Sequence, residues 1–150
     1  AEASRSASVT HDHPEGIKGA QAVAQAIFMA REGEMKEAIQ QAITRDFGYD
    51  FSRSIEQIRR SNLFDETCQG SVPEALSCFF ASKDFEDCIR LSVSIGGDTD
   101  TIACIAGGVA QAFYQDIPSW IVDESLKRLP QEFLDILYRF EQAFPIAGRY

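Results

Sequence analysis

The stretch Ile95-Gly96-Gly97-Asp98-Thr99-Asp100-Thr101 decides how the whole sequence is interpreted. It lies between Ser82 to Ser94, which continues a helical period, and the apolar run Ile102 to Phe113, and neither segment alternates apolar and polar residues as a strand would. The second segment has almost no polar side chains, and a helix that is apolar on every side belongs in the centre of a protein. We therefore predict a buried central helix over Ile102 to Phe113, which the chain enters through a polar loop containing two glycines.

Helical periodicity extends over most of the remaining chain. The predicted helices cover residues 14–30, 34–46, 55–60, 72–80, 82–94, 102–113, 117–129 and 131–144. Residues 62–71 have the composition of a loop, Pro73 is expected in the first turn of the next helix, and residues 1–9 form a polar leader. The predicted fold class is all-α, a compact arrangement of about seven or eight helices without significant sheet, in a single domain over residues 1–150.

The helical spacing also predicts which side chains face the core. The expected core positions are Val23, Ile27, Ala30, Met35, Ile39, Ala42, Ile43, Phe85, Cys88, Ile89, Val93, Phe133, Leu134, Leu137 and Phe140. The loop before Phe85 offers Ser82 or Asp84 as the helix cap.

Charge and composition exclude several classes of protein. The 14 Lys and Arg residues against 23 Asp and Glu residues give a net charge of −9, which repels nucleic-acid backbones. No apolar run is long enough to cross a bilayer. Four cysteines, Cys68, Cys78, Cys88 and Cys104, form no C-x-x-C motif, so we expect reduced, partly buried thiols in a cytoplasmic protein.

The polar loop before the central helix is the main candidate site. Asp98, Asp100 and Thr101 offer two carboxylates and a hydroxyl, the hard oxygen ligands that magnesium or manganese prefers. Gly96 and Gly97 allow backbone conformations that are closed to other residues. The alternative is a simple helix cap by Asp98 or Thr99, with Asp100 stabilising the positive end of the helix.

A second candidate site is the segment Thr10-His11-Asp12-His13. Zinc binding is disfavoured, because these are the only two histidines and no cysteine is near them in the sequence. A histidine just before a helix can instead help to hold a phosphate or a sugar hydroxyl. The alternative is that both histidines cap the helix and do nothing else.

Two further features are weaker candidates. The segment from Cys68 to Glu74 could shape a pocket wall, but a loop followed by a proline-initiated helix explains it without a ligand. Trp120 is expected to pack at the surface of the core rather than to stack on a base.

Three ordered blocks of the sequence resemble the ADP-ribosylglycohydrolase family, which is typified by dinitrogenase reductase-activating glycohydrolase. They are Thr10-His11-Asp12-His13-Pro14-Glu15-Gly16-Ile17-Lys18-Gly19-Ala20, Gly70-Ser71-Val72-Pro73-Glu74-Ala75-Leu76 and Ser94-Ile95-Gly96-Gly97-Asp98-Thr99-Asp100-Thr101-Ile102-Ala103. The third block is the most specific. The resemblance implies an all-α fold and a pair of magnesium ions where the reacting ribose sits.

The resemblance also implies roles for individual residues. Asp98, Asp100 and Thr101 are similar to ligands of the dinuclear metal centre, and Asp98 and Asp100 are the expected catalytic residues. His11 matches the histidine near bound ADP-ribose, whereas His13 matches less closely. The implied reaction is hydrolysis of the glycosidic bond between ADP-ribose and an acceptor, on an ADP-ribosylated protein or a small ADP-ribose derivative.

The resemblance covers only the C-terminal half of the family's usual length. The family's Thr-Asp-Asp metal motif is absent, and two magnesium ions need about six oxygens each, more than Asp98, Asp100 and Thr101 supply. We therefore expect the N-terminal half of the fold, cleaved, omitted or on a separate chain, to complete the site, and expect no activity from this chain alone.

Two other classes of function remain open. One is a non-catalytic, crystallin-like relative, and the other is a module that binds ADP-ribose or metal without cleaving the substrate. The intact Asp98, Asp100 and Thr101 set argues against a purely structural role.

Overall fold

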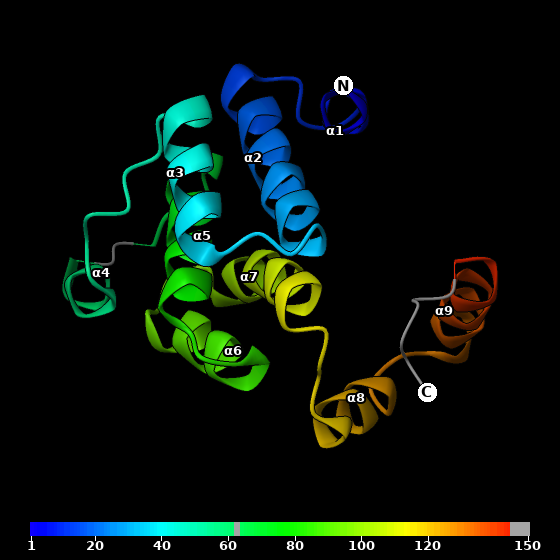
Figure 1. Ribbon diagram of the computed structural model, residues 1–150. Coiled ribbons are helices and arrows are strands. Elements are labelled where there is room, and N and C mark those ends of the chain that lie inside the picture. Colours follow the sequence, from blue (N-terminus) through cyan, green and yellow to red (C-terminus); the bar gives the residue numbers. More distant parts are fainter. Residues whose placement is uncertain (62–63, 145–150) are drawn as a thin grey trace. The chain divides into compact units, whose positions relative to one another are not determined.

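The computed structural model describes residues 1–61 and 64–144, and every regular element among them is a helix. The chain divides into two compact units, Ala1–Asp116 and Ile117–Tyr150. The first unit contains α1 (Glu2–Ala7), α2 (Pro14–Arg31), α3 (Lys36–Phe47), α4 (Ile55–Ser61), α5 (Cys68–Ala81), α6 (Phe85–Ser94) and α7 (Thr99–Tyr114) (Figure 1). The second contains α8 (Ser119–Leu126) and α9 (Gln131–Ala143). The predicted all-α class is confirmed, with nine helices in the part of the chain that the structure describes.

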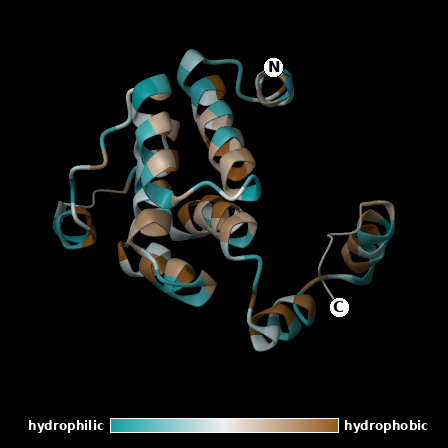
Figure 2. Ribbon diagram, in the orientation of Figure 1, coloured by the Kyte–Doolittle hydropathy of each residue, from teal (hydrophilic) through white to brown (hydrophobic). Residues whose placement is uncertain are grey.

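Helix α7 is the centre of the first unit. It packs against α2, α5 and α6 (Figure 1). Its buried side chains include Ile102, Ala106 and Val109, and its ribbon is largely hydrophobic (Figure 2). Each large apolar side chain buried in this way stabilises the fold by about 1.5–3 kcal/mol. The prediction of a helix buried on every side is wrong in one respect, because Cys104 and Gly108 are exposed.

Small residues set the distance between α2 and its neighbours. The buried positions of α2 are Gly19, Ala22, Ala26 and Ala30. A Cβ atom at Gly19 would lie 3.2 Å from Val72 Cγ2 and 3.4 Å from Cys68 Cβ, so this glycine lets α5 approach closely. The predicted core positions Val23 and Ile27 are only half-buried, because the helix presents its small residues, rather than its larger ones, to the core.

A lysine joins the ends of three helices in the first unit. The Lys36 ammonium, at the start of α3, donates hydrogen bonds to the Phe79 and Ser82 carbonyl oxygens at the end of α5. It also donates to the Tyr114 hydroxyl at the end of α7, with 2.7 Å between nitrogen and oxygen. The last carbonyls of a helix lack partners within the helix. Here Lys36 supplies a donor to them in addition to the Ser82 hydroxyl, which donates to the Phe79 carbonyl oxygen, and the Tyr114 hydroxyl, which donates to the Ser82 carbonyl oxygen.

Several predicted boundaries are corrected by the structure. Residues 2–7 of the predicted leader form α1, where Arg5 pairs with Glu2 one turn earlier. Helix α5 begins at Cys68 rather than Val72, because the Thr67 side chain accepts a hydrogen bond from the Gly70 N–H. Pro73 consequently lies inside α5 rather than in its first turn. Of the rest of the predicted 62–71 loop, Asn62 and Leu63 lie outside the described residues.

Two predicted core side chains have a different environment from the expected one. Met35 precedes α3 as its N-cap and is 67% exposed, while Val93 near the end of α6 is 56% exposed. Ile39, Ala42, Ile43, Phe85 and Cys88 are buried as predicted. Trp120 is 53% exposed at the start of α8.

The second unit consists of two short amphipathic helices. Helix α8 ends at Leu126, three residues before the predicted end, and no residue of α8 or α9 is buried. The apolar face of α9, predicted to face a core, is exposed, with Phe133, Leu137 and Phe140 at 49%, 43% and 61%. In Figure 2 this helix shows hydrophobic residues on one side and hydrophilic residues on the other.

The four cysteines are free, as predicted, but differ in environment. Cys78 and Cys88 are buried, Cys68 is half-buried and Cys104 is exposed. Burial raises the pKa of the Cys78 thiol to about 12 and that of the Cys88 thiol to about 11. Among the described helices, none is both long and apolar enough to cross a membrane.

Candidate functional site

The loop between α6 and α7 has the backbone that its glycines predict. Gly96 and Gly97 have φ values of 82° and 74°, in the left-handed region that disfavours residues with a side chain. The Thr99 N–H then donates to the Gly97 carbonyl oxygen at 2.9 Å, and the Ile102 N–H to the Asp98 carbonyl oxygen at 3.0 Å. The loop therefore turns tightly and begins α7 with Asp98 at the N-cap position.

The side chain of Asp98 does not cap the helix. Asp98 occupies the N-cap position of α7, but its carboxylate makes no capping hydrogen bond. It instead forms a hydrogen bond with the Asp100 carboxyl group, and this bond is the largest cause of the lowered pKa of Asp100. Hydrogen bonds from the backbone N–H groups of Thr101 and Asp100 lower the pKa of Asp100 further. The two carboxyl groups thus lie together at the positive end of a 16-residue helix.

The three predicted metal ligands share this helix end. Asp98 is half-buried, while Asp100 and Thr101 in the first turn are exposed, so their oxygens are accessible. Their donor chemistry fits magnesium or manganese. The described residues contain no group of three or more His, Cys, Asp and Glu side chains that could hold a metal ion. The donors at this helix end are therefore two carboxylates and one hydroxyl.

The two histidines lie at the start of α2. His13 is its N-cap, and the ring Nδ1 accepts a hydrogen bond from the Glu15 N–H at 3.2 Å. His11 is exposed, and its Nδ1 lies 2.8 Å from the Thr10 hydroxyl oxygen. A Cβ at Gly16 would lie 2.8 Å from the His11 carbonyl oxygen, so this glycine lets the segment fold back over the first turn of α2. His13 thus has the capping role considered above, whereas His11 does not cap the helix and is exposed.

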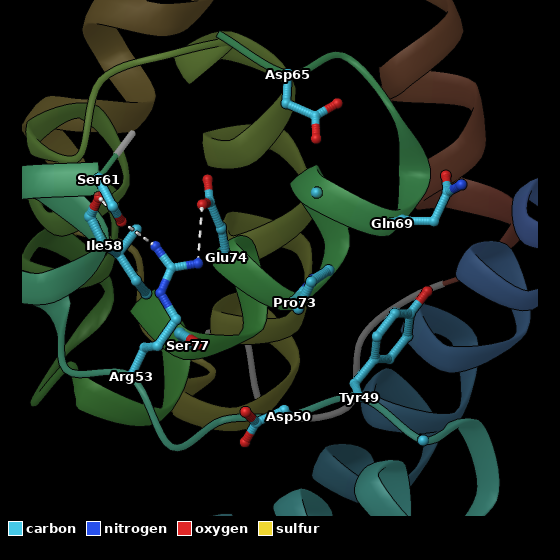
Figure 3. Close-up of a pocket in the computed structure, with 12 residues that line it drawn as sticks. Tyr49, Asp50, Arg53, Ile58, Ser61, Asp65, Gln69, Pro73, Glu74 and Ser77 are labelled. Carbon is cyan, nitrogen blue, oxygen red and sulfur yellow. Dashed lines mark hydrogen bonds and ion pairs between the residues drawn. The ribbon is translucent and has the colours of Figure 1, made fainter. Parts of the chain in front are cut away.

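A pocket, of which the sequence indicated only one possible wall, lies between α4, the segment before it and the first turns of α5. Its volume is about 440 Å³. Figure 3 shows Arg53 reaching across it toward Glu74, with 3.9 Å between the closest nitrogen and oxygen, and bonding the Ser61 hydroxyl. Burial raises the pKa of Glu74. Gly70 also lines the pocket, and a Cβ there would overlap the Asp65 carboxylate.

Neither the predicted metal ligands nor the histidines line this pocket. It is lined in part by Gln69, Gly70, Pro73 and Glu74, so the segment from Cys68 to Glu74 does form a pocket wall.

Comparison with known proteins identifies relatives of the chain. Residues 1–144 match the family model described as ADP-ribosylglycohydrolase. An uncharacterized protein of Archaeoglobus fulgidus is 34% identical over 148 residues, which cover 88% of this chain and 47% of that protein. The ADP-ribosylarginine hydrolase Tri1 of Pseudomonas putida is 28% identical, in a match that covers 85% of this chain and 38% of that protein.

Human ADP-ribosylhydrolase ARH3 is 30% identical over 118 residues, which cover 68% of this chain and 31% of that protein. The chain thus spans less than half the length of these relatives. No solved structure matches it. The match over almost all of its residues shows that the chain belongs to the ADP-ribosylglycohydrolase family.

Proposed function

We propose that this chain provides part of a magnesium-dependent site that hydrolyses the glycosidic bond between ADP-ribose and an acceptor. The observation that carries the proposal is the pair of carboxyl groups of Asp98 and Asp100, held together at the start of α7 without a capping role. Family membership and the names of the relatives support hydrolysis of an ADP-ribosyl bond as the reaction class.

Asp98, Asp100 and Thr101 would hold magnesium, with manganese as a substitute. The chemistry that the metal would supply when bound is to orient the ribose hydroxyls and to make a bound water more acidic. The chain's own contribution is to fix two carboxylates on a rigid helix end, and such a site stabilises the positive charge that develops on a ribose as its glycosidic bond breaks. His11, exposed beside the first turn of α2, would bind the phosphate or the distal ribose of ADP-ribose.

The remaining metal ligands would come from a part of the glycohydrolase domain that lies outside this chain. A magnesium shell of about six oxygens exceeds what Asp98, Asp100 and Thr101 provide. The chain on its own should therefore bind ligand more readily than it turns over substrate, and we expect no release of ADP-ribose from a modified protein by this chain alone.

Calorimetry with ADP-ribose in the presence of magnesium tests the proposal. Binding should be measurable for the unmodified chain, be lost in Asp100→Ala and weaken in His11→Ala. Asp123→Ala, which removes an exposed carboxylate from α8, is the matched control and should bind normally. Binding that survives Asp100→Ala would show that the ligand sits elsewhere, and rapid turnover by the chain alone would refute the incomplete site.

A further inference from the structure

Arg59 joins α4 to the end of α6. Its Nε donates a hydrogen bond to the Ser94 carbonyl oxygen at 3.1 Å, and its Nη2 donates to the Ser94 hydroxyl oxygen at 2.7 Å. The remaining nitrogen, Nη1, donates to Glu56 Oε2 on the preceding turn of α4 at 2.9 Å. The guanidinium is a rigid planar fork, so these bonds hold both the backbone and the side chain of Ser94.

Ser94 is the last residue of α6 and lies four positions before Asp98. Its hydroxyl also donates to the Leu91 carbonyl oxygen at 2.8 Å, which ties it to the last turn of the helix. The carbonyls at the end of a helix carry partial negative charge and lack partners within the helix. A guanidinium from a neighbouring helix therefore stabilises the helix end that leads into the loop before α7.

The loop after Ser94 has little backbone restraint of its own. Gly96 and Gly97 both have positive φ, and glycine adopts either sign of φ about equally well, so the pair can follow more than one path. The Gly96 N–H lies 3.5 Å from the Val93 carbonyl oxygen, which is long for a hydrogen bond of this type. The path of the loop therefore depends on how firmly the residues before it are held.

We propose that Arg59 is a positioning residue for the carboxylate pair at the start of α7. It fixes Ser94, and through the two glycines it sets where Asp98 and Asp100 lie. The effect on the loop follows from the hydrogen bonds alone. The effect on metal binding rests on the proposed function.

The next residue, Arg60, provides a matched control. Its Nε donates to Glu56 Oε1 at 3.0 Å, and among the described residues it bonds Glu56 alone. Its side chain is 78% exposed, whereas that of Arg59 is 42% exposed. Replacing either arginine by glutamine removes one positive charge and one bond to Glu56, but only Arg59→Gln removes the bonds to Ser94.

Hydrogen exchange of the loop, without any metal, is the first test. Mass spectrometry follows the amides of residues 95–101, under conditions in which circular dichroism shows each variant to be folded. We expect exchange about tenfold faster in Arg59→Gln than in Arg60→Gln or the unmodified chain, because loss of a restraint lets the loop open locally. Ser94→Ala, which removes one of the two acceptors, should give a smaller increase and carries the test if Arg59→Gln does not fold. Equal exchange in all four proteins would overturn the proposal.

Binding of Mn²⁺, followed by electron paramagnetic resonance, is the second test. Arg59→Gln should weaken binding by about tenfold, because groups that orient metal ligands typically contribute this much to affinity. Loss of positive charge near a cation site acts in the opposite direction, so Arg60→Gln should leave the affinity unchanged or raise it. Adding Ser94→Ala to Arg59→Gln should weaken binding no further, since both changes break the same contact.

The outcomes separate this proposal from the proposed function. Binding of Mn²⁺ to Arg59→Gln as tight as to the unmodified chain would overturn the positioning of the carboxylates by Arg59. Equal weakening in Arg59→Gln and Arg60→Gln would also overturn it, because the bonds to Ser94 would then have no specific effect. If the unmodified chain bound no Mn²⁺ while Arg59→Gln still accelerated exchange of the loop, the proposed function would be contradicted and the placement of the loop by Arg59 supported.

Discussion

Lys36 and Tyr114 lie 78 positions apart in the sequence, yet the ammonium of one donates to the hydroxyl of the other at 2.7 Å. The same ammonium lies 4.8 Å from the centre of the Phe79 ring and 5.1 Å from that of Tyr114. Tyr114 in turn donates to the Ser82 carbonyl oxygen at 2.7 Å. This cluster fixes the ends of α5 and α7 and therefore the position of the helix that carries Asp98 and Asp100.

Replacement of Lys36 should destabilise the fold. Lys36→Met keeps the length of the side chain but leaves the Phe79 and Ser82 carbonyl oxygens without this donor, at a cost of about 1–3 kcal/mol. Urea unfolding followed by circular dichroism measures the change. Lys83→Met, at an exposed lysine, is the control and should change the free energy of unfolding by less than about 0.5 kcal/mol. Equal stability of the two variants would contradict the role of Lys36.

Alanine should be tolerated in place of Gly108 in the central helix α7 but not in place of Gly97 in the loop before that helix. Gly97→Ala places a Cβ on a residue with φ of 74° and should cost about 1–2 kcal/mol. Gly108→Ala, in an open helical position, should stabilise the protein by about 0.5–1 kcal/mol. Thermal unfolding of both variants tests this. A stabilised Gly97→Ala variant would show that the loop backbone differs from the one described.

The four thiols should react in a fixed order. In the native chain at neutral pH, Cys104 should react first with a disulfide reagent, and Cys68 should follow more slowly. Cys78 and Cys88 should react only after unfolding, since burial raises their pKa to about 12 and about 11. Mass spectrometry of each labelled peptide gives the order. Rapid labelling of Cys78 in the native protein would contradict the packing of α5 against α6.

Asp46 should stabilise the fold above its ordinary pKa and lose that effect in acid. Hydrogen bonds from Arg45 and Gln25 lower its pKa to about 2. A carboxyl group with a lowered pKa in the folded state contributes stability that is present above its ordinary pKa and is lost as the pH falls toward the folded value. Asp46→Asn should therefore differ from the unmodified chain at pH 5 and converge with it near pH 2. A constant difference across this range would exclude a titrating contribution.

Local patterns in the sequence predicted much of the fold. The extents of α2, α3, α4 and α9 follow from periodicity, and the Asp84 side chain caps α6 through the Asp87 N–H at 2.7 Å. The start of α5 was missed because Gly70 and Pro73 are typical of a loop. The Thr67 cap outweighs them, since it supplies a partner for the Gly70 N–H.

Long-range contacts could not be predicted in this way. The sequence around Lys36 does not indicate that its ammonium donates to carbonyl oxygens more than 40 positions away. Likewise, the need for a small residue at Gly107 is explained only by the contact with Ile89 of α6. The candidate site was predictable in part, because Asp98, Asp100 and Thr101 are adjacent in the sequence. Of the pocket beside Arg53 and Glu74, the sequence indicated only the possible wall from Cys68 to Glu74, because residues from separate elements form the rest.

Binding of manganese to the isolated chain tests the central claim most directly. Electron paramagnetic resonance measures free Mn²⁺ during titration and requires neither substrate nor turnover. The account predicts saturable binding that magnesium displaces, that is lost in Asp98→Asn and in Asp100→Asn, and that is unchanged in Asp123→Asn. Binding of equal strength in all four proteins would contradict a metal site at the Asp98 and Asp100 pair, as would no binding by the unmodified chain.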